Sequence, residues 1–159
     1  MLNEGDKVPN FCLDGIDEKG DEKRFCLEDL LKNGKDIILY FYPKDDTPGC
    51  TTEACDFRDN FNILSDKVLV VGVSPDSIES HKKFKEKYNL NFILLSDKDK
   101  EVMKMFGAYG KKKMYGKETE GVIRSTFLIS KDGTIKKAWR NVKAKGHVAQ
   151  IIKYLENEK

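Results

Sequence analysis

Between Tyr42 and Cys55 the chain reads Tyr-Pro-Lys-Asp-Asp-Thr-Pro-Gly-Cys-Thr-Thr-Glu-Ala-Cys. The apolar run that ends at Tyr42 predicts a buried strand, and Pro48-Gly49 leads into a predicted helix that starts at Cys50. Backbone N–H groups and the dipole at a helix start favour a thiolate over a thiol. Cys55 adds a second thiol five positions later. The segment therefore predicts a strand, a loop and a helix that together carry thiol-based redox chemistry.

Further apolar runs alternate with segments of helical spacing. The runs Ile37–Tyr42, Val68–Val73 and Phe92–Leu95 are dense enough to predict strands buried on both faces of a sheet. Between them, the segments Asp56–Leu64 and Ser77–Tyr88 have apolar residues at helical intervals. The alternation predicts an α/β domain with parallel strands.

Both ends of the chain add elements to this α/β unit. A turn at Glu18–Asp21 predicts an N-terminal β-hairpin, and the turn Lys131–Thr134 predicts a second hairpin that joins Thr126–Ser130 to Ile135–Trp139. The apolar stripe of residues 147–155 predicts a C-terminal helix. With no internal repeat or linker, we expect residues 1–159 to form one domain.

Composition excludes several broad classes of protein. The 29 Lys and Arg residues nearly balance the 27 Asp and Glu residues, so nothing indicates a nucleic-acid or membrane surface. No apolar stretch approaches the roughly 20 residues that a membrane span needs. The N-terminus lacks the pattern of a signal peptide, and we therefore expect a cytoplasmic protein.

The other two cysteines, Cys12 and Cys26, fall in the predicted N-terminal hairpin. Because reducing compartments disfavour permanent disulfides, we favour buried packing for both and keep a regulatory Cys12–Cys26 disulfide as the alternative. The spacing from Cys50 to Cys55 does not match a structural zinc site, so no metal is expected.

Two residues outside the predicted helix are candidates for supporting the Cys50 thiolate. Arg124 lies just before a predicted apolar strand, and on its own an arginine there is typical of a solvated residue at a strand edge. Thr47 precedes Cys50 by three residues, and on its own it reads as a turn residue ahead of Pro48.

These residues together resemble the active-site signature of the peroxiredoxins. The match is Pro43-x-x-x-Thr47-x-x-Cys50 with the distant Arg124, and it extends to the peroxiredoxin Q or bacterioferritin comigratory protein subfamily. That extension comprises Tyr42–Thr51 with Glu53 and Cys55, Gly5–Phe11, Arg124–Ile129 and Gly146-His147. The resemblance implies a thioredoxin-like fold, a central mixed β-sheet flanked by helices, that reduces hydrogen peroxide and organic hydroperoxides without metal or bound cofactor.

The resemblance also implies a role for each signature residue. Cys50 is then the peroxidatic nucleophile that becomes a sulfenic acid, with Arg124, Thr47 and backbone N–H groups stabilising charge on the leaving oxygen. Pro43 walls the pocket. Gly49 supports the pocket. Glu53 orients Arg124, and the alternative for Glu53 is a solvent-facing position in the first helical turn.

The resemblance implies that Cys55 is the resolving thiol of an atypical 2-Cys mechanism. The alternative is that Cys55 is an inert thiol on the helix. On one regular helix, Cα atoms five residues apart lie roughly 8–9 Å from each other, beyond the distance of about 7 Å that a disulfide allows. We therefore expect the segment Cys50–Asp59 to rearrange on oxidation.

The resemblance makes thioredoxin or a similar dithiol the expected reductant, and the intrachain pair favours a monomer. A second hypothesis for the function is a protein thiol–disulfide oxidoreductase, which the absence of Cys-x-x-Cys disfavours. A peroxide sensor or holdase-type binding protein is a third.

Overall fold

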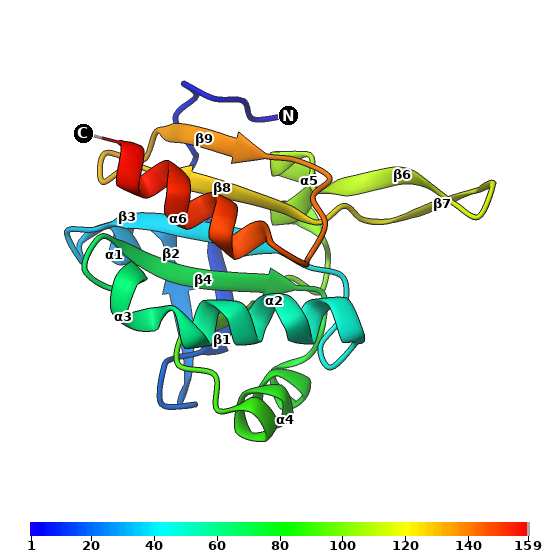
Figure 1. Cartoon of the computed structure of the whole chain (residues 1–159), viewed down its shortest axis with the longest axis horizontal. Helices are drawn as coiled ribbons and strands as arrows, with labels where there is room; N and C mark the ends of the chain where they lie inside the picture. Colours follow the sequence, from blue (N-terminus) through cyan, green and yellow to red (C-terminus); the bar gives the residue numbers. More distant parts are fainter. Residues whose placement is uncertain (159) are drawn as a thin grey trace.

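The computed structural model describes residues 1–158 and is organised around a seven-stranded mixed sheet with the order β2-β1-β5-β4-β3-β8-β9 (Figure 1). The strands are β1 (Cys12–Ile16), β2 (Glu22–Cys26), β3 (Asp36–Phe41), β4 (Val68–Ser74), β5 (Ile93–Ser96), β8 (Ser125–Ile129) and β9 (Ile135–Trp139). The central neighbours β3, β4 and β5 run parallel, and the flanking strands pair antiparallel. The expected α/β class, with a central mixed sheet, is confirmed.

Helices cover both faces of this sheet (Figure 1). They are α1 (Leu27–Leu31), α2 (Pro48–Asp59), α3 (Phe61–Leu64), α4 (Ile78–Tyr88), α5 (Glu101–Phe106) and α6 (His147–Asn157). Side chains of α2, α3, α4 and α6 join one buried cluster, whereas those of α1 and α5 join the other. The catalytic candidate Cys50 belongs to the first of these clusters.

Successive side chains of β3 point to opposite faces of the sheet, so they belong alternately to the two buried clusters. Ile37, Leu39 and Phe41 pack with α1 and α5. Ile38 and Tyr40 pack on the opposite face, with α2. Since both faces are covered, the strand is apolar throughout, which is why it was readable as a buried strand from sequence.

The segment after α5 departs from the expectation. No strand was expected here, but the basic run Lys111–Lys113 lies in β6 (Tyr109–Met114), which pairs antiparallel with β7 (Lys117–Val122). Figure 1 shows this two-stranded ribbon projecting away from the main sheet. Because the ribbon is largely exposed, its side chains have no apolar alternation by which a strand is recognised.

The favoured prediction for Cys12 and Cys26 was wrong. The two residues are directly opposite in the β1–β2 register and form a disulfide, with Cα atoms 4.0 Å apart. Both side chains are partly exposed and not buried. The alternative of a Cys12–Cys26 bond is therefore the one that the structure bears out, while its regulatory role stays a prediction.

Among residues 1–158, no helix combines the length and the apolar character that crossing a membrane requires.

Candidate active site

The loop between β3 and α2 delivers Cys50 to the first turn of a helix. Thr47 is the N-cap in an extended conformation, and Pro48 occupies the first helical position, where its missing N–H costs no hydrogen bond. The helix therefore begins two residues earlier than the predicted start at Cys50. Cys50 is a free thiol and is 2% exposed. Cys50 lies in the first turn of α2, where backbone N–H groups lack helical partners.

Arg124, immediately ahead of β8, reaches across to this helix. Its Nη2 lies 3.3 Å from Cys50 Sγ, and its Nη1 donates to Glu53 Oε1 at 2.5 Å. The Arg124 side chain is 14% exposed and that of Glu53 is fully buried. One guanidinium thus contacts two residues that lie one helical turn apart on α2.

Glu53 is not the solvent-facing residue that was the alternative reading. Burial raises the pKa of its carboxyl to about 7, against the attraction of Arg124, which lowers it. Among the described residues, Glu53 Oε2 has no hydrogen-bond partner. A protonated carboxyl suits this arrangement, because Oε1 still accepts from Arg124 while the other oxygen holds the proton.

Gly49 allows the guanidinium to approach the helix. A Cβ atom at this position would lie 3.2 Å from Arg124 Nη2. Such a contact is tighter than ordinary van der Waals packing, so a larger residue would displace the arginine away from the sulfur. The absence of a side chain at Gly49 therefore leaves room for the observed position of Arg124.

Pro43 and Thr47 border the same region. Pro43 and Arg124 line a cleft of about 620 Å³ that also includes Lys111, Lys112 and Asn141. The Thr47 hydroxyl donates to the Lys44 carbonyl at 2.8 Å. In the described part of the chain it makes no hydrogen bond to Cys50. The hydrogen bond to Lys44 instead stabilises the loop between β3 and α2.

Cys55 lies on the same uninterrupted helix as Cys50. It is a free, partly exposed thiol, and burial raises its pKa. Because α2 is regular from Pro48 to Asp59, the two thiols are on different sides of the helix and are not brought together in this state.

The sequence did not predict a buried contact between Asp45 and His81, beneath the loop that joins β3 to α2. His81 is fully buried, and its Nδ1 lies 2.6 Å from Asp45 Oδ2. The two residues are 36 positions apart, so only their tertiary contact identifies the pair. The one available signal was Asp45, an acidic residue close to the end of an apolar strand.

Comparison with known proteins places this arrangement in a family. Residues 4–138 match the model of the AhpC/TSA family. The chain belongs to the AhpC/TSA family. Curated relatives include a putative peroxiredoxin bcp of Coxiella burnetii, 50% identical over 93% of this chain and 95% of that protein. Another is peroxiredoxin Bcp of Bacillus subtilis, 49% identical over 96% of this chain and 94% of that protein.

Solved structures agree with this assignment. A cysteine-to-serine mutant of PrxQ from Xylella fastidiosa has a TM-score of 0.88 and 35% identity, covering 98% of this chain and 96% of that one. A cysteine-to-serine mutant of peroxiredoxin Q from Xanthomonas campestris has a TM-score of 0.82 and 36% identity, covering 92% of this chain and 89% of that one. The predicted resemblance to the peroxiredoxin Q subfamily is confirmed, and the chain is a peroxiredoxin, a thiol-dependent peroxidase.

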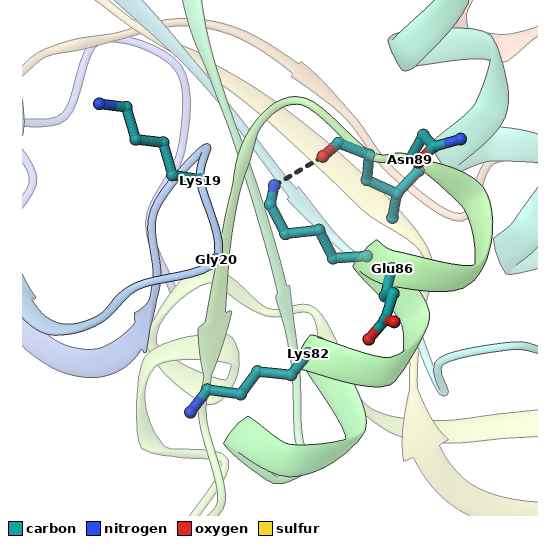
Figure 2. Close-up of a pocket in the computed structure, with 7 residues that line it drawn as sticks. Lys19, Gly20, Lys82, Glu86 and Asn89 are labelled. Carbon is teal, nitrogen blue, oxygen red and sulfur yellow. Dashed lines mark hydrogen bonds between the residues drawn. The ribbon is translucent and has the colours of Figure 1, made fainter.

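A second cleft of this peroxiredoxin contains none of the signature residues. It measures about 480 Å³ and lies between the Lys19–Gly20 turn and α4, where Figure 2 shows Lys82 and Glu86 on the helix. Lys85 in this cleft donates to the Leu90 carbonyl at 2.6 Å, and burial lowers its pKa to about 8. Lys85 satisfies backbone carbonyls that follow α4, so its role here is structural.

Proposed function

We propose that Cys50 is the nucleophile that attacks the hydroperoxide. Its thiolate sulfur forms a bond to one peroxide oxygen while the O–O bond breaks, giving a sulfenic acid. The other oxygen leaves as hydroxide or alkoxide and takes up a proton to become water or an alcohol. The observation that supports this assignment is the distance of 3.3 Å between Cys50 Sγ and Arg124 Nη2.

Arg124 is proposed to act on both the sulfur and the leaving oxygen. A fixed cation beside the sulfur favours the thiolate, and the same N–H groups offer donors where charge develops on the leaving oxygen. Glu53 holds the guanidinium in place through Nη1. Pro43 walls the cleft beside Arg124, and Thr47 fixes the loop that leads to Cys50.

Cys55 is proposed to resolve the sulfenic acid. Its thiol sulfur attacks the sulfur of Cys50, a disulfide forms, and water leaves. Since Cys50 and Cys55 are separated on a regular helix, this step requires the first turns of α2 to unwind. Peroxiredoxins need a thiol reductant to restore the dithiol, and we propose thioredoxin or a similar dithiol protein for this chain.

The proposed substrates are hydrogen peroxide and organic hydroperoxides. Reduction of alkyl peroxides is stated for the bacterioferritin comigratory protein of Xanthomonas campestris, whose structure has a TM-score of 0.80 and 36% identity to this chain. The cleft of about 620 Å³ beside Arg124 is large enough for a substituent on the peroxide.

Three further assignments belong to this proposal. Residues 1–159 act as one domain, because both cores share the single large sheet. The protein works as a monomer, since both proposed cysteines lie on one chain. It works in the cytoplasm, where dithiol reductants are maintained.

The proposal is tested by peroxide-dependent NADPH consumption with thioredoxin and thioredoxin reductase. Wild type should turn over, Cys50→Ser should not, and Cys55→Ser should oxidise once and then stop with thioredoxin as reductant. Turnover that survives Cys50→Ser would reject the assigned nucleophile. Full turnover of Cys55→Ser would reject the assigned resolving thiol.

A further inference from the structure

A buried pair of side chains, Asp45 and His81, underlies the segment that leads into α2. His81, in α4, and Asp45, in the loop after β3, have side chains that are 0% and 3% exposed. We propose that Asp45 and His81 form a positioning latch that holds residues 43–50 in the geometry in which Cys50 reacts. This inference rests on the proposed function, because it concerns the reaction of the same cysteine.

Hydrogen bonds satisfy the polar side-chain atoms of the pair. His81 Nε2 lies 2.8 Å from the carbonyl oxygen of Leu95, which can only accept. Its Nδ1 faces Asp45, which also accepts from the Tyr42 hydroxyl at 2.6 Å and the Ser80 hydroxyl at 2.8 Å. Each ring nitrogen therefore has one oxygen partner, and both oxygens of the Asp45 carboxyl are hydrogen-bonded.

The latch ties the loop to several parts of the fold. The backbone N–H of Asp45 donates to Asp76 Oδ2 at 2.7 Å, just beyond β4, and the Ser74 hydroxyl donates to the same oxygen. His81 belongs to α4, and its acceptor Leu95 belongs to β5. Loss of one partner would leave a buried polar group of the other without its hydrogen bond, and the loop would lose this attachment to α4.

The next residue gives the loop a second, exposed attachment to α4. Asp46 accepts from Lys87 Nζ at 2.8 Å and from the Tyr88 hydroxyl at 2.7 Å. At the other end of α2, Arg58 Nη1 donates to the Tyr88 carbonyl at 2.6 Å. The helix α4 therefore holds the segment before α2 and also its last turn.

This arrangement bears on two competing fates of the Cys50 sulfenic acid. It condenses with Cys55 after α2 unwinds, or it reacts with a second hydroperoxide, gaining one oxygen to become a sulfinic acid while that peroxide is reduced to water or alcohol. A weaker latch misplaces Cys50 relative to Arg124 and slows the first oxidation. It also eases unwinding, which favours the disulfide over the sulfinic acid.

The test measures both effects in His81→Gln. We expect the rate constant for oxidation of Cys50 to fall about tenfold, because small displacements of reacting groups carry large kinetic costs. We also expect a smaller sulfinic fraction than wild type, by intact mass, at the same excess of hydrogen peroxide. Glu86→Gln is the matched control, because Glu86 is exposed on α4 and, among the described residues, makes no hydrogen bond with the loop, and it should leave both readouts within about twofold of wild type.

Ser80→Ala keeps the test decisive if His81→Gln does not fold. It removes one donor to Asp45 without changing the core, and we expect a fall of about threefold in the oxidation rate. A folded variant whose Cys50 oxidation rate and sulfinic fraction both equal those of wild type would overturn the proposed latch. If only its thermal stability were lowered, the role of the pair would be structural. Failure of wild-type Cys50 to oxidise at all would instead reject the proposed function, and the latch with it.

Discussion

Arg124 Nη2 lies 3.3 Å from Cys50 Sγ, although the two residues are 74 positions apart in the chain. The same guanidinium is fixed from its other side by Glu53. Planar, forked donors of arginine serve two partners at once, which the single ammonium of lysine cannot do in the same geometry.

Arg124→Lys should therefore lower the rate of Cys50 oxidation by about 10²–10³-fold, the loss seen when one donor to a developing anion is removed. Stopped-flow measurement with hydrogen peroxide gives this rate constant. Arg24→Lys is a suitable control, because Arg24 forms an exposed ion pair with Asp14 in β1. A rate for Arg124→Lys within twofold of the control would contradict the role of the guanidinium.

Gly49→Ala should separate helix stability from catalysis. Alanine favours a helix interior over glycine by about 1 kcal/mol, so the free energy of unfolding should stay equal or rise. The new Cβ would stand 3.2 Å from Arg124 Nη2 and displace it, and we expect the oxidation rate to fall about threefold to tenfold. Urea unfolding and stopped-flow rates on the same sample check both. An unchanged rate would show that Arg124 tolerates the contact.

Glu53 should make stability depend on pH. Its pKa is raised from 4.5 to about 7 by burial, so the folded state holds a proton that the unfolded state releases between these values. The contribution is full below pH 4.5 and is lost as the pH rises towards about 7. The free energy of unfolding of wild type relative to Glu53→Gln should therefore fall across this window.

Urea unfolding at several pH values measures this difference. Glu120→Gln, at an exposed position on β7, should show no such slope relative to wild type. A difference between wild type and Glu53→Gln that is flat, or that grows with pH, would contradict the raised pKa.

The Cys12–Cys26 disulfide should stabilise the protein without serving turnover. It closes a loop of 14 residues, and a loop of about this size contributes about 3 kcal/mol in the chain-entropy model. The double variant Cys12→Ser/Cys26→Ser should lose up to about this free energy of unfolding and keep the wild-type rate of peroxide reduction. A several-fold fall in that rate in the folded double variant would instead connect this pair to catalysis.

Much of the fold was predictable because buried parallel strands are apolar on both faces. The prediction Val68–Val73 corresponds to β4 (Val68–Ser74), and Ser77–Tyr88 corresponds to α4 with Ser77 as its N-cap. The β6–β7 ribbon was missed for the opposite reason, since it buries little and its lysines follow no apolar period.

The candidate site was predictable in its residue types and less so in its contacts. The signature around Cys50 identified Arg124 and suggested that Glu53 orients it, and the structure contains the contact between the two. The Asp45–His81 pair and the Cys12–Cys26 disulfide were missed or disfavoured because each depends on tertiary neighbours or strand register, which composition does not specify.

The central claim is that Cys50 and Cys55 form a disulfide only when α2 unwinds, and hydrogen exchange with peptide mapping tests it most directly. After oxidation by hydrogen peroxide, we predict a Cys50–Cys55 bond together with lost amide protection in residues 50–59 relative to the reduced protein. Protection that is identical in the two redox states, or a bond from Cys50 to any cysteine other than Cys55, would contradict the account.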